Sequence, residues 1–314
     1  KTFWAKLSSY YTWFLFIGIY IVSGFFVPTL FDPDTIINVI LIQGVTVCLL
    51  STGMAFVMLI GEIDLSIVAV AAFAPMMGVL TWEVGFLPPH LAIFFALLIG
   101  IGVGLFNGLM ITKLRIPSLV QTVTMWWILG GIVLIITKGV AKTGLPIAWM
   151  WLGRAFVGPI PVLVLFFILI IIATVLFSRR TVTGMRLYLV GGNSEACRVM
   201  GTPVDKIRII AFMISGFFAA LSGYALSARM GFISARFATE WLMPAIAAPV
   251  IAGVSLTGGR GNFINVIAGA YLVQLIVIIV RAGGFSGYYT DFIQGLLVFA
   301  AVLVDTVRRR VTGW

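Results

Sequence analysis

Long apolar stretches recur through almost the whole of this chain, and they constrain its fold more than any other feature. Each is about 20 residues long, the length that a helix needs to cross a hydrocarbon core of roughly 30 Å. Composition agrees, because 61% of the residues are apolar, 10% are charged and the mean hydropathy is +1.17. We therefore expect an all-α integral membrane protein in which residues 1–314 form a single transmembrane domain.

The apolar pattern predicts about ten transmembrane helices. They cover residues Thr12–Leu30, Ile36–Ile60, Leu65–Trp82, Pro89–Thr112, Pro117–Thr137, Pro159–Ser178, Ile209–Arg229, Trp241–Leu256, Asn262–Arg281 and Tyr289–Val307. Because the number is even, both termini are expected on the same side of the membrane.

The basic residues indicate which side that is, because cytoplasmic loops retain Lys and Arg. With the N-terminus inside, the inner segments hold fourteen basic residues and the outer segments hold six. The inner set is Lys1, Lys6, Lys113, Arg115, Arg179, Arg180, Arg186, Arg198, Lys206, Arg208, Arg260, Arg308, Arg309 and Arg310, and the outer set is Lys138, Lys142, Arg154, Arg229, Arg236 and Arg281. We expect cytoplasmic termini, and we explain the net charge of +10 by topology rather than by nucleic-acid binding.

Two segments do not resemble plain membrane spans. Gly61–Ser66 (GEIDLS) places two carboxylates between adjacent apolar runs, and Trp241–Leu256 is short, contains two prolines and leads into the glycine-rich Thr257–Gly261. Irregular backbone at membrane depth is tolerated only where protein or a water-filled cavity satisfies its polar groups. These segments are therefore candidates for a translocation pathway.

Asp64 is the most notable ionisable residue, since a carboxylate within a membrane helix costs roughly 2.5–3.5 kcal/mol on insertion scales. It has two interpretations. With Ser66 it can cap the helix that follows, or it can take part in gating.

Polar and aromatic side chains within the spans are further candidates for the pathway: Asn107, Gln121, Thr124 and Trp126. Hydrogen bonds between helices and a belt of interfacial tryptophans explain the same residues without a ligand. Arg229, Arg236 and Glu240 lie near the predicted outer face, where they either contact a docked partner or form an ordinary solvated loop.

The cytoplasmic stretch Arg179–Arg208 contains the polar sequence GGNSEACRVMGT at Gly191–Thr202. A start at Asn193 or Ser194 and a stop at Gly201 predict a short amphipathic helix. It is too small to be a domain, so we expect it to dock on a partner.

Two other features have plain explanations. Gly100, Gly102, Gly104 and Gly108 form a ridge of small residues that lets helices approach closely in lipid. The single histidine, His90, has no Cys, Asp or Glu partner at ligand spacing, so no metal site and no catalytic set are predicted. The chain is not expected to be an enzyme.

Four stretches resemble the permease subunits of bacterial ABC sugar importers of the ribose, galactose, arabinose and autoinducer-2 type. GMAFVMLIGEIDLSI (53–67) is similar to GMTFVILTGGIDLSVG, and GLFNGLMITKLRIPSLVQTVTM (104–125) is similar to GxxNGLLIxKxxIPPFIATLGTM. GGNSEACRVMGT (191–202) is similar to GGNxEAARLSGI, and AIAAPVIAGVSLTGGRGNFINVIAGA (245–270) is similar to AIAAVVIGGTSLxGGxGxxxGTxxGA.

The resemblance implies a multi-pass permease of the bacterial inner membrane that translocates a small carbohydrate. Its implied partners are a second identical or related permease, cytoplasmic ABC ATPase subunits, a periplasmic sugar-binding protein and membrane lipid. ATP and magnesium would be used by the ATPase, with no cofactor on this chain. The residues implied to couple to the ATPase are Gly191, Gly192, Asn193, Ser194, Glu195, Ala196, Cys197, Arg198 and Gly201.

The chain departs from the family pattern at Glu62, which stands where the family usually has Gly, and at Ile67–Val68, Ser118, Cys197 and Asn265. These departures bear on substrate identity more than on the fold. The alternative function is that of a secondary, ion-coupled transporter of a small polar solute. Such a transporter needs ion sites within the membrane, and carboxylates there are nearly absent.

Overall fold

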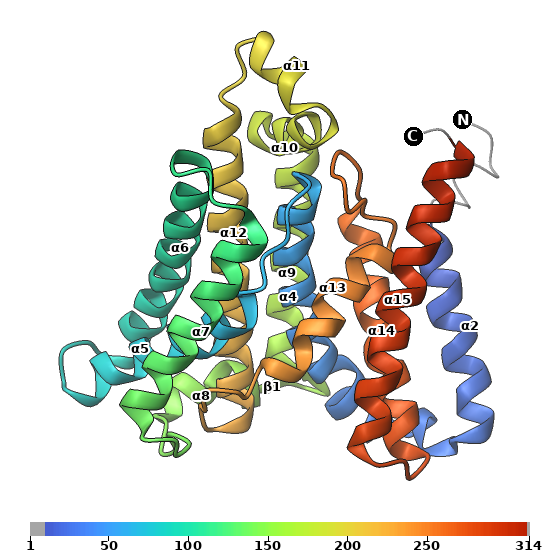
Figure 1. The fold of residues 1–314 in the computed structure, drawn as a ribbon. Helices are drawn as coiled ribbons and strands as arrows, with labels where there is room; N and C mark the ends of the chain where they lie inside the picture. Colours follow the sequence, from blue (N-terminus) through green and yellow to red (C-terminus); the bar gives the residue numbers. More distant parts are fainter. Residues whose placement is uncertain (1–9, 313–314) are drawn as a thin grey trace.

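A helix occupies each of the ten predicted segments in the computed structural model, which describes residues 10–312 (Figure 1). These helices are α2 (Tyr11–Phe26), α4 (Ile42–Leu59), α5 (Ile67–Glu83), α6 (Pro89–Lys113), α7 (Ser118–Thr137), α9 (Val162–Arg180), α12 (Val204–Met230), α13 (Leu242–Ile251), α14 (Phe263–Ala282) and α15 (Gly287–Thr312). The shorter elements are η2 (Pro28–Phe31), α3 (Pro33–Thr35), η3 (Ile36–Leu41), α8 (Ile147–Arg154), the antiparallel pair β1 (Phe156–Val157) and β2 (Ile160–Pro161), α10 (Val182–Gly192), α11 (Ser194–Val199) and η4 (Thr239–Trp241).

Within residues 10–312, six helical segments are long and apolar enough to cross a membrane. They are Pro33–Leu59, α6, α7, α9, α12 and α14. The expected all-α membrane protein is therefore confirmed, whereas the count of ten spans is not established by helix length. Segments α2, α5 and η4–α13 are apolar but shorter.

Both ends of the described chain lie at the same end of the bundle (Figure 1). There, α2 begins and α15 finishes, and the same end carries α10 and α11. We name this the α11 end. The opposite end carries α8 and the β1–β2 pair.

Two chain segments are interrupted by irregular backbone. After α4 reaches the α11 end, residues 61–66 turn back into the bundle before α5 starts, so α5 spans only 17 residues. Helix α13 rises from the opposite end but stops at Ile251, and residues 252–262 continue as a loop towards the α11 end. With η4 it is about 20 Å long at 1.5 Å per residue, too short to cross the membrane alone. The span predicted at Trp241–Leu256 is thus a short helix followed by a loop.

Helices α6 and α12 pack backbone to backbone along the glycine ridge. A Cβ at Gly100 or Gly104 would overlap the carbonyl oxygens of Gly216 and Phe212, and one at Gly108 would lie 2.8 Å from the Ile209 Cα. The packing role is confirmed for these three glycines. Gly102 is different, because a Cβ there would meet nothing within 4 Å.

Candidate functional site

Helix α11 is the predicted short helix at the polar stretch, and local side chains define its ends. The Asn193 Oδ1 accepts a hydrogen bond from the Ala196 N–H at 2.9 Å, which caps the first turn. Glu195 lies in that turn, where its charge favours the helix dipole. Gly201 has φ +76°, a conformation that glycine adopts without strain, and it ends the helical path.

The side chains of α11 divide into a packed face and an exposed tip. Cys197 is buried, whereas Glu195 and Arg198 are exposed. Val199 and Met200 are 88% and 70% exposed. Motif comparison did not single out these two apolar residues, although an apolar pair inside a polar segment was a visible signal for a partner contact.

Three segments meet below α11 through close backbone contacts, and we name this contact the glycine junction. Gly191, at the end of α10, packs so closely that a Cβ would overlap the Leu59 carbonyl oxygen at the end of α4. The Gly259 N–H, from the loop between α13 and α14, donates to that same oxygen at 2.9 Å. On the same loop, a Cβ at Gly258 would lie 2.8 Å from the Gly61 nitrogen.

The glycine junction joins three of the four stretches that carry the family resemblance: 53–67, 191–202 and 245–270. It also touches both interrupted segments. Packed backbones have no flexible side chain that can absorb a shift, so the positions of α10 and of these loops depend on one another.

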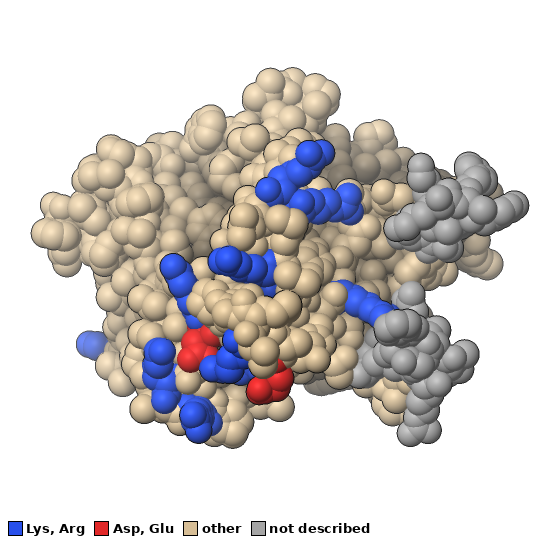
Figure 2. Space-filling view, turned by 90° about the horizontal axis from the view of Figure 1, so that it is seen from above, with Lys and Arg blue, Asp and Glu red and all other residues tan. Residues whose placement is uncertain are grey.

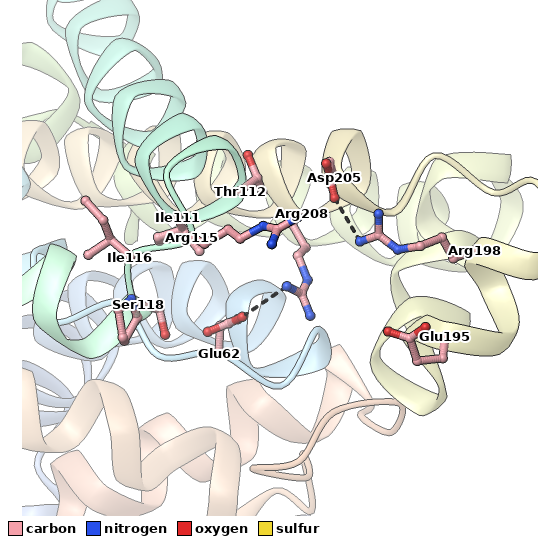
Figure 3. A pocket seen from close by; sticks show the side chains of 11 residues that line it. Glu62, Ile111, Thr112, Arg115, Ile116, Ser118, Glu195, Arg198, Asp205 and Arg208 are labelled. Carbon is pink, nitrogen blue, oxygen red and sulfur yellow. Dashed lines mark hydrogen bonds and ion pairs between the residues drawn. The ribbon is translucent and has the colours of Figure 1, made fainter.

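A polar pocket of about 570 Å³ lies beside α11 at the surface of the α11 end (Figure 3). Arg208 of α12 points across it to Glu62, with 3.8 Å between Nη1 and Oε1, and Arg198 of α11 pairs with Asp205 at 3.1 Å. The lining is Glu62, Ile111, Thr112, Arg115, Ile116, Pro117, Ser118, Glu195, Arg198, Asp205 and Arg208. Glu62, the residue that departs from the family pattern, therefore links the interrupted segment to α12.

Asp64 lies at the centre of a buried hydrogen-bond network. One carboxylate oxygen accepts from the Ser66 N–H at 3.0 Å and from the Ser66 hydroxyl, and the other accepts from the Ser215 hydroxyl at 2.8 Å. Ser215 is about 16 Å along α12 from Val204 at 1.5 Å per residue, so the carboxylate lies well inside the bundle.

The network continues through two more of the predicted pathway residues. The Asn107 Nδ2 donates to the Ser66 hydroxyl oxygen at 3.0 Å, and the Gln121 Nε2 donates to the Asn107 Oδ1 at 3.1 Å. All five side chains are buried. Ser66 is the N-cap residue of α5, and this helix has no side-chain cap hydrogen bond, so the prediction that Asp64 caps it is wrong. Asp64 instead ties the turn before α5 to α12, while Asn107 and Gln121 extend the connection to α6 and α7.

The other two predicted pathway residues lie apart from this network. The Thr124 hydroxyl is exposed and donates to the Val120 carbonyl of its own helix at 2.8 Å. Trp126 stacks on the neighbouring Trp127 and packs partly against the core. Sequence reasoning also missed Ser215, because a serine within a long apolar helix carries no local signal of its partner.

Basic residues gather at the α11 end. Viewed from this end, Lys and Arg side chains dominate the charged groups on the surface (Figure 2). The described basic residues of the predicted inner set belong to segments that finish or begin at this end: Lys113, Arg115, Arg179, Arg180, Arg186, Arg198, Lys206, Arg208, Arg260, Arg308, Arg309 and Arg310. Lys1 and Lys6 lie outside the described residues.

A bundle of apolar helices with interrupted segments, a polar end that carries a short exposed helix, and a buried polar network between helices together define a multi-pass membrane permease. Residues 36–302 match the family model described as "Branched-chain amino acid transport system / permease component". The chain belongs to this family.

Its relatives include permeases of one import system. The chain is 34% identical to the Autoinducer 2 import system permease protein LsrC of Yersinia enterocolitica, over 82% of its own length and 71% of the relative's. The proteins of that name from Yersinia pestis and Yersinia pseudotuberculosis are 32% and 33% identical, over 82% of this chain and 73% of theirs. No solved structure matches the chain. The resemblance to importer permeases drawn from the sequence motifs is confirmed.

Proposed function

We propose that the chain is the membrane subunit of an ATP-driven importer of a small carbohydrate, with α11 as the helix that couples it to a cytoplasmic ATPase. The observation that carries the proposal is the position of α11. It is exposed at the basic end of the bundle and is tied through Gly191 to both interrupted segments. Such a helix can convert closure of an ATPase into movement of the pathway.

Coupling then follows a chain of contacts. Val199 and Met200 enter a groove of the ATPase, because burying exposed apolar side chains stabilises the complex. Movement of α11 displaces the glycine junction directly, and it displaces the start of α12 through the Arg198–Asp205 pair. Both routes reach residues 61–66, since Arg208 binds Glu62 and Ser215 binds Asp64.

The orientation and surroundings follow from charge and apolar surface. In this proposal the basic α11 end faces the cytoplasm, as the positive-inside rule favours, both termini lie on that side, and the membrane is the bacterial inner membrane. The flanks of the bundle expose large apolar side chains such as Phe94, Trp127 and Ile135. They contact lipid or a second permease, identical or related, that completes the pathway.

The carbohydrate cargo is supported by the relatives and by the chemistry of the chain. The relatives are named for import of autoinducer 2, whereas the family description names branched-chain amino acids. Polar groups between the helices are mostly amides and hydroxyls, which bind neutral hydroxylated solutes. A periplasmic binding protein delivers the solute, so the permease itself needs only weak affinity.

Reconstitution tests this function. The permease is purified with its ATPase, placed in proteoliposomes with the binding protein, and supplied with labelled ribose, galactose or arabinose. We expect uptake to require ATP, and we expect the rate of ATP hydrolysis to rise when loaded binding protein is added. A Val199→Asp variant should lose both uptake and this stimulation, because a charge would enter the apolar contact with the ATPase. Uptake driven by an ion gradient without ATP would instead establish the secondary transporter.

A further inference from the structure

We infer that the opposite end of the bundle contains a binding site for a small neutral, polyhydroxylated ligand, in a cavity of about 380 Å³ between α4, α12, α14 and α15. This inference rests on the proposed function and assigns the site where the permease first receives its cargo. The volume falls in the range of small-molecule sites, roughly 300–1,000 Å³.

Amide side chains form the polar lining of the cavity. The Gln274 Nε2 donates to the Gln43 Oε1 at 3.1 Å, which leaves the Gln43 NH₂ group and the Gln274 oxygen free to bind a ligand. Asn38 accepts from Arg229 at 3.2 Å and keeps its own NH₂ group. These groups offer both donors and acceptors, as a hydroxylated ligand requires.

Gln294 is the least satisfied of these amides. Its side chain is 6% exposed and lines the cavity, and it makes no hydrogen bond to any residue of the described range 10–312. Buried polar groups nearly always have a partner. A bound ligand supplies one.

The remaining lining selects against cationic ligands, because its second arginine, Arg229, is bound among the described residues only to the neutral Asn38 amide and can donate to ligand hydroxyls. Arg281 is paired with Glu240 at 3.0 Å, so the one carboxylate of the lining is already neutralised. Phe237 and Trp241 contribute aromatic surface, on which the apolar C–H face of a sugar ring can pack. An amino acid would need a free carboxylate for its ammonium group, and the lining provides none.

A second hollow of about 630 Å³ adjoins this cavity at the same end. The two share Met230, Phe237, Glu240 and Gln294 in their linings. The hollow adds Arg236 and Asp291, which are charged groups suited to contact with a docked binding protein. The cavity therefore lies directly behind the surface from which a delivered solute enters.

Uptake measured with matched variants tests the site. In the reconstituted complex, Gln274→Leu removes a cavity amide with little change in volume, and Thr174→Val removes a buried hydroxyl of α9 that bonds to the Ile170 carbonyl of its own helix and does not line the cavity. We expect ribose uptake to fall about tenfold in the first variant, as for a loss of 1.4 kcal/mol, and less than twofold in the second. Equal uptake by wild type and Gln274→Leu would overturn the site, whereas absence of ATP-driven uptake in the wild type would overturn the proposed function instead.

A labelling measurement keeps the test decisive if Gln274→Leu fails to fold. Phe237→Cys, with Cys48 and Cys197 replaced by Ala, places a thiol where cavity and hollow meet. We expect saturating D-ribose to slow its reaction with a maleimide at least threefold, and L-leucine to have no effect. Protection by L-leucine alone would identify an amino-acid site, and protection by neither would exclude a site at this position.

Discussion

At the scale of single residues, Asp64 connects two helices. Its two oxygens accept from Ser66 and Ser215, so one buried carboxylate holds α5 against α12. Hydrogen bonds to a charged group contribute roughly 1.5–3 kcal/mol each, which offsets part of the cost of burying the charge. A carboxylate that binds two helices in this way can act in gating as well as in packing.

An Asp64→Asn substitution separates these two roles. Asparagine keeps the shape and one acceptor oxygen, so we expect a folded protein that elutes as a single species, with its melting temperature lowered by a few degrees. The new NH₂ group can donate to the Ser215 hydroxyl, but this neutral bond is weaker than the charge-assisted bond that it replaces, so we expect transport to fall several-fold. The matched control is Thr124→Val, which changes an exposed hydroxyl outside the network. Normal transport by Asp64→Asn would leave the carboxylate with a packing role alone.

At the scale of elements, the glycine junction is where α10 and α11 meet the rest of the molecule. Two adjacent glycines at the end of α10 behave differently. A Cβ on Gly191 would overlap the Leu59 carbonyl, whereas a Cβ on Gly192 would meet nothing within 4 Å. Alanine at these two positions therefore separates the loss of the contact with α4 from the effect of alanine on the local backbone.

The pair Gly191→Ala and Gly192→Ala tests transmission through the junction. We expect Gly191→Ala to separate α10 from α4, which lowers uptake at least tenfold while ATP hydrolysis continues, because the ATPase still binds α11 but its movement no longer reaches residues 61–66. Gly192→Ala should match the wild type in uptake and hydrolysis, measured in the same proteoliposomes. Similar losses in both variants would mean that flexibility of the segment, and not the contact, matters.

Helix positions follow from the sequence because an apolar run of sufficient length has few alternatives in a membrane. The interruptions were harder to place. The start of α5 and the end of α13 depend on contacts between Gly61, Gly191 and Gly258, which are far apart in the chain. Likewise, apolar residues lie on every side of α7, so the pattern did not show that Gln121 faces the bundle while Thr124 faces outwards. Asp64, Asn107 and Gln121 were found because a polar group in a membrane helix is costly.

At the scale of the whole molecule, the two ends differ in chemistry. The α11 end is basic, carries α11 and holds the junction. The opposite end holds the amide-lined cavity and its hollow. An importer needs two ends that differ in this way, since solute arrives at one face while ATP is used at the other.

Cysteine labelling measures which face is which. Val199, at the tip of α11, and Val157, in the β1–β2 pair at the opposite end, are 88% and 62% exposed, while Cys48 and Cys197 are buried and add little background. In intact spheroplasts, we expect a membrane-impermeant maleimide to label Val157→Cys but not Val199→Cys. After permeabilisation both should react, which controls for the accessibility of each thiol. Labelling of Val199→Cys in intact spheroplasts would place the basic end outside, against the positive-inside rule, and would remove α11 from the reach of any cytoplasmic ATPase.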